Sequence, residues 1–223
     1  SFFDSRIQWK SLVGIEDSVI QVEFKDHYLY AVTTKGKASN YKLIKIDLRK
    51  PDAKNAAVVI PEKDIMIQSM ATSRDYLLLV YSDGINSHLY KLTLAGEKLE
   101  KIATPLKGTM GVYNLDKSTN EFIVNIGSYI LPFTEFEYDA SLEEWKKSRY
   151  NNVPVFPEKY SRLIVEDVEV KGHDGTMIPL TMVYDKDLVK DGNNVCLMES
   201  YGAYGSSMVP YFNPMQASLA TRG

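Results

Sequence analysis

The most constraining feature of this sequence is a repeat of about 46 residues in its first two thirds. Each copy opens with a polar residue, an aromatic residue and then a run of apolar and β-branched residues, which is typical of a buried strand. The three runs cover residues 27–33, 75–81 and 121–126. Their aromatic positions, Tyr28, Tyr76 and Phe122, lie 48 and then 46 residues apart. The repeat therefore predicts one supersecondary unit used three times.

Each copy continues with further strand patterns. Residues 40–47, 88–94 and 133–139 alternate apolar and polar side chains, as half-exposed strands do, and shorter strands fit at 56–60, 67–72 and 99–104. About four strands per repeat predicts the blade of a β-propeller, and a β-sandwich with coincidental spacing is the alternative. Propellers typically have four to eight blades. We therefore interpret the chain as three late blades, with part of a fourth in residues 1–24, and expect further blades upstream in a longer protein.

The pattern changes after residue 150. Residues 151–163 are typical of a linker, and 164–171 and 177–184 predict a β-hairpin whose Pro179 places the second strand at an edge or faces outward. The apolar run 195–200 predicts a strand covered on both faces, followed by a glycine-rich turn and a helix that begins at Asn213-Pro214 and is capped by Gly223. We predict a mostly β chain of two parts, a partial β-propeller over 1–157 and the first strands and helix of an α/β domain over 158–223.

Composition excludes several classes of function. The 223 residues carry a net charge of −3, so charge gives no reason to expect nucleic acid or an anionic membrane as a partner. The single cysteine, Cys196, excludes an internal disulfide and a zinc site built from several cysteines, and we expect it to be buried in its apolar run. The three histidines are scattered without metal-ligand spacing. We therefore expect no metal and no cofactor.

The glycine-rich turn at 201–207 carries the main candidate for chemistry. It lacks the spacing of a phosphate-binding loop. It does follow a predicted buried strand, where α/β-hydrolases place a loop that completes the oxyanion hole. Tyr201 would present a phenol that keeps its proton at neutral pH and could donate to an oxyanion. The alternative is a tyrosine packed at the edge of a sheet. The chain contains no Gly-x-Ser-x-Gly motif, so a serine nucleophile would have to lie elsewhere.

Several of these segments resemble one family. The motifs are Asp-Gly-Thr-Met-Ile-Pro-Leu at 174–180, Val-Tyr-Asp-Lys-Asp-Leu at 183–188 and Tyr-Gly-Ala-Tyr-Gly at 201–205, with more diffuse likeness at 40–47 and 136–139. Together they resemble the prolyl oligopeptidase family of serine peptidases. The Tyr-Gly-x-Tyr-Gly form looks closer to the oligopeptidase B branch than to prolyl endopeptidases proper. Glu199-Ser200 departs from the Tyr-Gly usually found before the oxyanion tyrosine.

The resemblance implies a propeller that caps an α/β-hydrolase domain and admits only oligopeptides to it. Tyr201 matches the oxyanion-hole tyrosine, and Tyr204 matches an aromatic position near the substrate pocket. The family's Ser, Asp and His fall beyond Gly223, so we expect the chain alone to be inactive. The rival hypothesis is a non-catalytic propeller interaction module with a structural α/β appendage. The cleavage preference, the oligomeric state and the compartment, with the cytoplasm slightly favoured over the periplasm, stay open.

Overall fold

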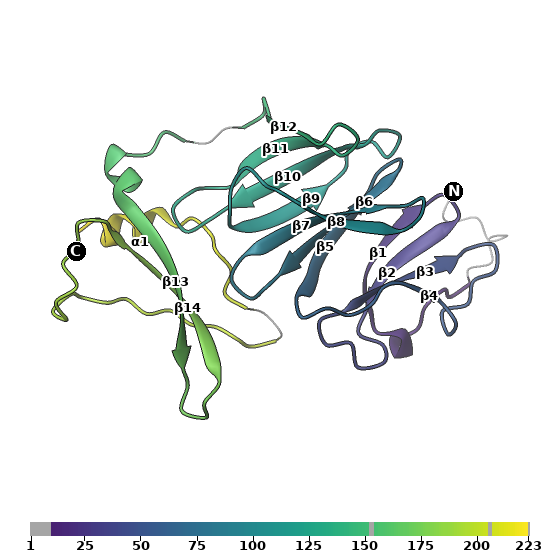
Figure 1. Cartoon of the computed structure of the whole chain (residues 1–223), viewed down its shortest axis with the longest axis horizontal. Coiled ribbons are helices and arrows are strands. Elements are labelled where there is room, and N and C mark those ends of the chain that lie inside the picture. The colour runs from purple at the N-terminus through teal and green to yellow at the C-terminus, as the bar shows by residue number, and fades with distance from the viewer. Residues whose placement is uncertain (1–9, 152–153, 205–206, 223) are drawn as a thin grey trace.

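The computed structural model describes residues 10–151, 154–204 and 207–222, and Figure 1 shows their arrangement. Twelve of the strands form three four-stranded antiparallel sheets that follow one another along the chain. We call these sheets blades 1, 2 and 3. In each of them the strands lie in sequence order, so every strand is hydrogen-bonded to the next one along the chain.

The bounds of the blade strands follow the repeat. Blade 1 contains β1 (Val19–Lys25), β2 (Tyr28–Thr33), β3 (Lys42–Asp47) and β4 (Ala57–Ile60). Blade 2 contains β5 (Met66–Thr72), β6 (Tyr76–Ser82), β7 (Ser87–Thr93) and β8 (Lys98–Ile102). Blade 3 contains β9 (Thr109–Tyr113), β10 (Glu121–Gly127), β11 (Thr134–Asp139) and β12 (Glu144–Lys147). A short 3₁₀ helix, η1 (Ile15–Asp17), precedes β1.

The four-stranded unit predicted from the repeat is confirmed, and one boundary is wrong. β1 is the first strand of blade 1, because it pairs with β2 from Val19↔Thr33 to Lys25↔Tyr28. Within residues 10–24 there is thus no separate fourth blade; residues 1–9 lie outside the described residues. The sequence patterns also missed β9 and β12. Gly111 interrupts the apolar pattern of β9, and β12 is mostly exposed and polar.

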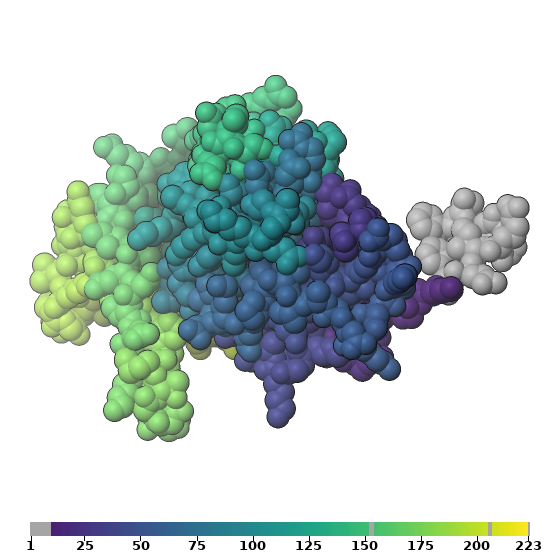
Figure 2. All heavy atoms as spheres, turned by 45° about the vertical axis from the view of Figure 1, so that its right-hand side comes forward, coloured from purple at the N-terminus to yellow at the C-terminus, as the bar shows by residue number. Residues whose placement is uncertain are grey.

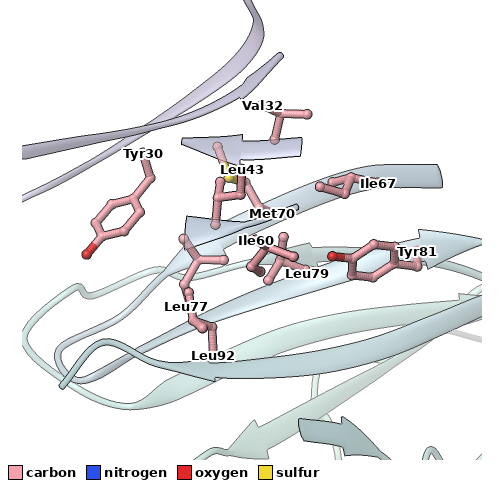
Figure 3. Packing of buried hydrophobic residues seen from close by; sticks show 10 residues of the cluster. All are labelled: Tyr30, Val32, Leu43, Ile60, Ile67, Met70, Leu77, Leu79, Tyr81 and Leu92. Carbon is pink, nitrogen blue, oxygen red and sulfur yellow. The ribbon is translucent and has the colours of Figure 1, made fainter. Parts of the chain in front are cut away.

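Strand β6, one of the two inner strands of blade 2, is buried on both faces. Along β6, alternate side chains point to opposite faces of the sheet. Leu77, Leu79 and Tyr81 pack against Tyr30, Val32 and Leu43 of blade 1, as Figure 3 shows. Leu78 and Val80 instead pack with side chains of blade 3, namely Phe122, Val124 and Ile126. The four aliphatic side chains of β6 have no exposed surface, so this strand joins two hydrophobic cores.

Polar side chains fasten blade 2 to blade 3. Asn120, which is buried, donates from Nδ2 to Asp75 Oδ2 at 2.8 Å and to Ser141 Oγ at 2.7 Å. Its Oδ1 accepts from the Asp75 backbone N–H at 2.9 Å and from Ser73 Oγ at 3.1 Å. The hydrogen bond from Asn120, together with Arg74, lowers the pKa of the Asp75 carboxyl. A buried amide whose hydrogen bonds cross between sheets fixes how the two blades align.

A buried lysine provides a second link between these blades. Lys91 on β7 is 5% exposed. Its Nζ donates to the Ala140 carbonyl at 3.2 Å, pairs with Glu143 and lies 5.1 Å from the centre of the Tyr76 ring. Ala140 and Glu143 belong to the loop between β11 and β12, so the charge of a blade 2 side chain is satisfied by blade 3.

The chain leaves the blades through a short 3₁₀ helix, η2 (Glu158–Arg162), which lies inside the predicted linker. It then forms the predicted hairpin, β13 (Leu163–Lys171) paired with β14 (Met177–Asp185). Pro179 faces Glu169 in a two-stranded sheet, where both strands are edges, as its missing N–H requires. In Figure 2 the green hairpin projects from the body of the molecule.

Helix α1 (Pro214–Ala220) begins where the sequence predicts. Asn213 caps it, since its Oδ1 accepts from the Met215 backbone N–H at 3.0 Å, and Pro214 occupies the first turn. The predicted cap Gly223 lies outside the described residues; the helix ends at Ala220, and Thr221 is its C-cap. Ala217 of α1 is buried, and α1 contacts β14 of the hairpin. The division of the chain at residue 157 stays a prediction.

The double burial of β6 predicts the cost of shortening one of its side chains. We expect Leu77→Ala to lower the free energy of unfolding by about 2–5 kcal/mol, because it leaves a cavity between two blades. Urea unfolding followed by circular dichroism measures the change. The matched control is Leu142→Ala, whose parent side chain is 65% exposed and which should change stability by less than about 0.5 kcal/mol. Equal losses in the two variants would contradict the packing described.

A buried tyrosine predicts a loss of stability in alkali. The hydroxyl of Tyr138 is buried without a hydrogen-bond partner among the described residues, and burial raises its pKa to about 12. Because this pKa is above the unfolded value of 10.0, the contribution of Tyr138 is complete below pH 10 and is lost as the pH rises toward 12. Absorbance of tyrosinate near 295 nm after a rapid pH jump should show a group of tyrosines that ionise only at high pH. Tyr138→Phe should reduce the absorbance change that comes from this late class of tyrosines. An unchanged late class would contradict this assignment.

Candidate functional site

The segment between β14 and α1 carries the candidate residues. It leaves the hairpin in a set of turns, with the Lys186 N–H donating to the Arg162 carbonyl at 2.9 Å and the Leu188 N–H to the Asp185 carbonyl at 2.9 Å. Arg162 closes this corner by donating from Nη2 to Asp185 Oδ1 at 2.9 Å and to Asp187 Oδ2 at 2.8 Å. The hydrogen bond from Arg162 lowers the pKa of Asp185. The corner therefore fixes the direction in which the chain leaves the hairpin.

The buried strand predicted at 195–200 is wrong for this structure. These residues form neither strand nor helix, and Val195, Leu197 and Met198 are 89%, 65% and 79% exposed. Cys196, expected to be buried, is exposed as well. A strand exists only where another strand satisfies its backbone, and no described strand lies beside this run.

Tyr201 and Tyr204 follow this run directly. Tyr201 is 54% exposed and Tyr204 is fully exposed. Tyr204 has a φ of 56°, which is the left-handed region that a non-glycine residue adopts rarely. The next two residues of the glycine-rich turn, Gly205 and Ser206, lie outside the described residues. Among the described residues this part of the chain forms no sheet, and the role of Tyr201 stays a prediction.

Three contacts hold the segment, one to the helix that follows it and two to the residues just before the hairpin. Glu199 accepts through Oε2 from Gln216 Nε2 at 2.7 Å, which ties the residues just before Tyr201 to α1. Three aromatic rings, Phe156, Tyr160 and Phe212, pack together, with the Phe156 and Phe212 ring centres 4.5 Å apart. The Tyr160 hydroxyl also donates to the Pro214 carbonyl at 3.2 Å. The segment is therefore tied down at Glu199 and at Phe212 although it forms no regular secondary structure.

A cavity of about 500 Å³ separates the end of this segment from the blades. Ser207 and Val209 line one side, and residues from the ends of blades 1 and 2 line the other, namely Asn40, Asp64, Met66, Gln68, Ser82, Asp83 and Gly84. The propeller side of the cavity is thus polar and acidic. Asp83 accepts from the backbone N–H groups of Ile85 and Asn86 and pairs with His88 Nε2 at 2.7 Å. Burial opposes ionisation of Asp83, but these hydrogen bonds leave its pKa lowered.

The structure also joins residues that the sequence did not single out. Asp167 on β13 accepts from Asn86 Nδ2 at 3.2 Å and from the Thr181 hydroxyl at 2.8 Å. Tyr129 lies between β10 and β11. Burial is the main reason why the pKa of Tyr129 is raised. Asn86 and Asp167 are 81 positions apart and share no motif, so no local pattern could have revealed their contact.

The three histidines lie far apart from one another. His173 is exposed in the hairpin turn, His88 pairs with Asp83, and the His27 ring lies tilted against Tyr28 with ring centres 4.1 Å apart. Within the described residues, no group of three or more His, Cys, Asp or Glu side chains is placed to hold a metal ion. The part of the chain that is described also has no helix long and apolar enough to cross a membrane.

The blades define the class of protein to which the chain belongs, a β-propeller. A sequence model of the N-terminal β-propeller domain of prolyl oligopeptidases matches residues 3–149. The chain therefore belongs to the prolyl oligopeptidase family, as the motifs indicated.

Individual relatives agree with this assignment. The prolyl endopeptidase of Elizabethkingia meningoseptica is 26% identical over 95% of this chain and 29% of its own length. A solved structure from a study of two prolyl endopeptidases has a TM-score of 0.81 at 22% identity, covering 91% of this chain and 30% of the other. Oligopeptidase B from Leishmania major has a TM-score of 0.72 at 23% identity, covering 86% and 28%. These likenesses do not separate the two branches.

The chain spans about 29% of the length of the curated relatives it matches. The match extends past the propeller, because relatives aligned over 95% of the chain include much of the region after residue 149. The residues after the propeller are therefore shared with these peptidases as sequence.

Proposed function

We propose that this chain is part of a serine oligopeptidase and supplies late propeller blades, residues 1–157, and the first part of an α/β-hydrolase domain, residues 158–223. The observation that carries the proposal is the family match over 3–149 together with relatives aligned across 95% of the chain. The reaction is hydrolysis of short peptides through an acyl-enzyme. A serine attacks the peptide carbonyl, the amine leaves with a proton, and water releases the acid product.

Tyr201 is the residue of this chain that we assign to the chemistry. When the carbonyl carbon becomes tetrahedral, its oxygen gains negative charge, and a phenol O–H can stabilise that charge without losing its proton. The support is the position of Tyr201 after an apolar run and beside a tethered turn, and its exposed side chain, which is free to face a substrate. In this proposal the serine, aspartate and histidine lie outside the chain, so residues 1–223 alone do not hydrolyse peptides.

Two further roles belong to the same proposal. Tyr204, fully exposed beside Tyr201, contacts the substrate near its binding pocket. The propeller restricts access to the catalytic residues, so oligopeptides reach them and folded proteins do not. The cavity of about 500 Å³ between blades and hydrolase segment supports this second role, since it has the volume of a small-ligand site and lies between the two parts.

The oxyanion role of Tyr201 predicts a specific kinetic change. In the longer protein, Tyr201→Phe should lower kcat by roughly 100- to 1000-fold, because one oxyanion donor is removed while the ring remains. KM should change little, since the interaction forms mainly in the transition state. Steady-state hydrolysis of a chromogenic oligopeptide measures both constants.

The control is Tyr150→Phe, which removes a hydroxyl from a side chain that is 70% exposed and follows the last propeller strand. Its kinetic constants should equal those of the wild type. If Tyr201→Phe also leaves kcat unchanged, Tyr201 is not an oxyanion donor. If the wild-type protein hydrolyses no peptide at all, the chain belongs to a non-catalytic propeller module instead.

A further inference from the structure

A clasp of three side chains joins blade 1 to blade 2. Lys45 on β3 forms an ion pair with Glu97, which lies in the turn between β7 and β8. The Lys45 Nζ also lies 5.1 Å from the centre of the Tyr28 ring on β2, so the ring and the carboxylate both stabilise the ammonium charge. The hydrogen bond to Glu97 raises the pKa of Lys45. A charge on blade 1 is therefore neutralised by a carboxylate of the next blade.

The same clasp joins blade 2 to blade 3. Lys91 forms an ion pair with Glu143, and its Nζ lies 5.1 Å from the centre of the Tyr76 ring. The two lysines of the clasps are 46 residues apart, and so are the two glutamates. Both glutamates have a positive φ, 52° at Glu97 and 59° at Glu143, so the two turns share their backbone conformation at this residue. The clasp is therefore a repeated device by which one blade recognises the next.

Strand pairing shows which residues of blade 3 occupy the clasp positions. In blades 1 and 2, the residue that pairs with the lysine lies two places after the tyrosine of the clasp. Glu137 lies 46 residues after Lys91, and two places before its own pairing partner is Glu121. Blade 3 thus has one carboxylate in place of the lysine and a second carboxylate in place of the ring. The charge of the clasp is reversed in this blade.

The apolar part of the interface is also replaced in blade 3. Blade 2 presents Val80 and Leu89 to blade 3, and neither has exposed surface. The corresponding pair in blade 3 is Asn125 and Glu135, which lie on the face that points away from blade 2, here called the far face. Among the described helices and strands, blade 3 packs mainly against blade 2. The far face therefore lacks the hydrophobic core that joins the other blades.

We propose that the far face of blade 3 binds another blade of the longer protein, one that has a lysine or arginine where blades 2 and 3 have Glu97 and Glu143. The basic side chain pairs with Glu137 and lies beside Glu121. This rests on the proposed function, in which the chain supplies some blades of a closed propeller, because every blade of a closed propeller has a neighbour on both faces. A glutamate in that turn would repel Glu137, so the reversed clasp also excludes a blade of the wrong type.

Charge reversal in the longer protein tests the reversed clasp. Glu137→Lys places an ammonium group against the predicted basic residue, and hydrogen exchange with peptide mass spectrometry shows which backbone amides respond. We expect exchange to become roughly three- to thirtyfold faster in one propeller turn that lies outside residues 1–223 and contains a lysine or arginine, because an ion pair is lost and like charges meet. Replacing that basic residue by glutamate in the Glu137→Lys protein should restore the slow exchange.

Two further variants make the result decisive. Glu137→Gln removes the charge without reversing it, so it should accelerate exchange less, at the same turn, and it tests the contact if Glu137→Lys fails to fold. Glu144→Lys is the matched control, because it makes the same change of charge on the far face. Glu144 takes the place of Lys98, which pairs with Glu100 of its own blade and not with the next one. Glu144→Lys should therefore leave the responding turn unchanged.

Faster exchange at a basic propeller turn, reversed by the charge swap and absent in Glu144→Lys, supports the proposal. Four results overturn it: no response outside residues 1–223, a response in a turn without lysine or arginine, a response outside the propeller, or an equal response to Glu144→Lys. Peptide hydrolysis is not measured, so the reversed clasp can fail while the peptidase proposal stands, and the reverse.

Discussion

The structure depends on burial of strand β6 on both faces. Leu77 and Leu79 complete the core shared with blade 1, whereas Leu78 and Val80 complete the core shared with blade 3. A fully buried aliphatic side chain contributes about 1.5–3 kcal/mol, so this one strand anchors both neighbouring sheets. The polar links of Asn120 and Lys91 then set how blades 2 and 3 align. Because the blades are stacked in this way, the turns at one end, including the one that carries Asn86, have fixed positions against the hairpin.

The two parts of the chain differ in how far their backbone groups are paired and their apolar side chains are buried. Every blade strand has a hydrogen-bonded neighbour, whereas the run 195–200 has none among the described residues and exposes its apolar side chains. Tyr201 and Tyr204 follow that run, so the residues assigned to chemistry lie where the local fold is least complete. The Glu199–Gln216 hydrogen bond to α1 and the packing of Phe156 against Phe212 limit this freedom.

Much of the fold could be predicted from the sequence because apolar alternation is a local signal. The strands that carry the repeat and the hairpin were found in this way, and the Asn213-Pro214 pair gave the helix start through its own local capping signal. β12 was missed because an outer strand with one half-buried residue has no apolar pattern, and β1 was assigned to a separate blade because pattern does not say which strand it pairs with. The run 195–200 was assigned to a strand because its apolar residues favour a buried strand. Composition does not say whether a neighbouring strand is present to pair with it. The contact between Asn86 and Asp167 joins distant residues, which no local pattern reports.

Hydrogen exchange of the backbone amides tests the central claim most directly, because it compares all parts of the chain in one experiment. If β6 anchors the stack, its amides should exchange only through global unfolding and be among the slowest in the chain. The hairpin amides of β13 and β14 should exchange faster through local opening, and those of 195–204 faster still. Protection of 195–204 equal to that of β6, or exchange of β6 as fast as that of the hairpin, would contradict the account.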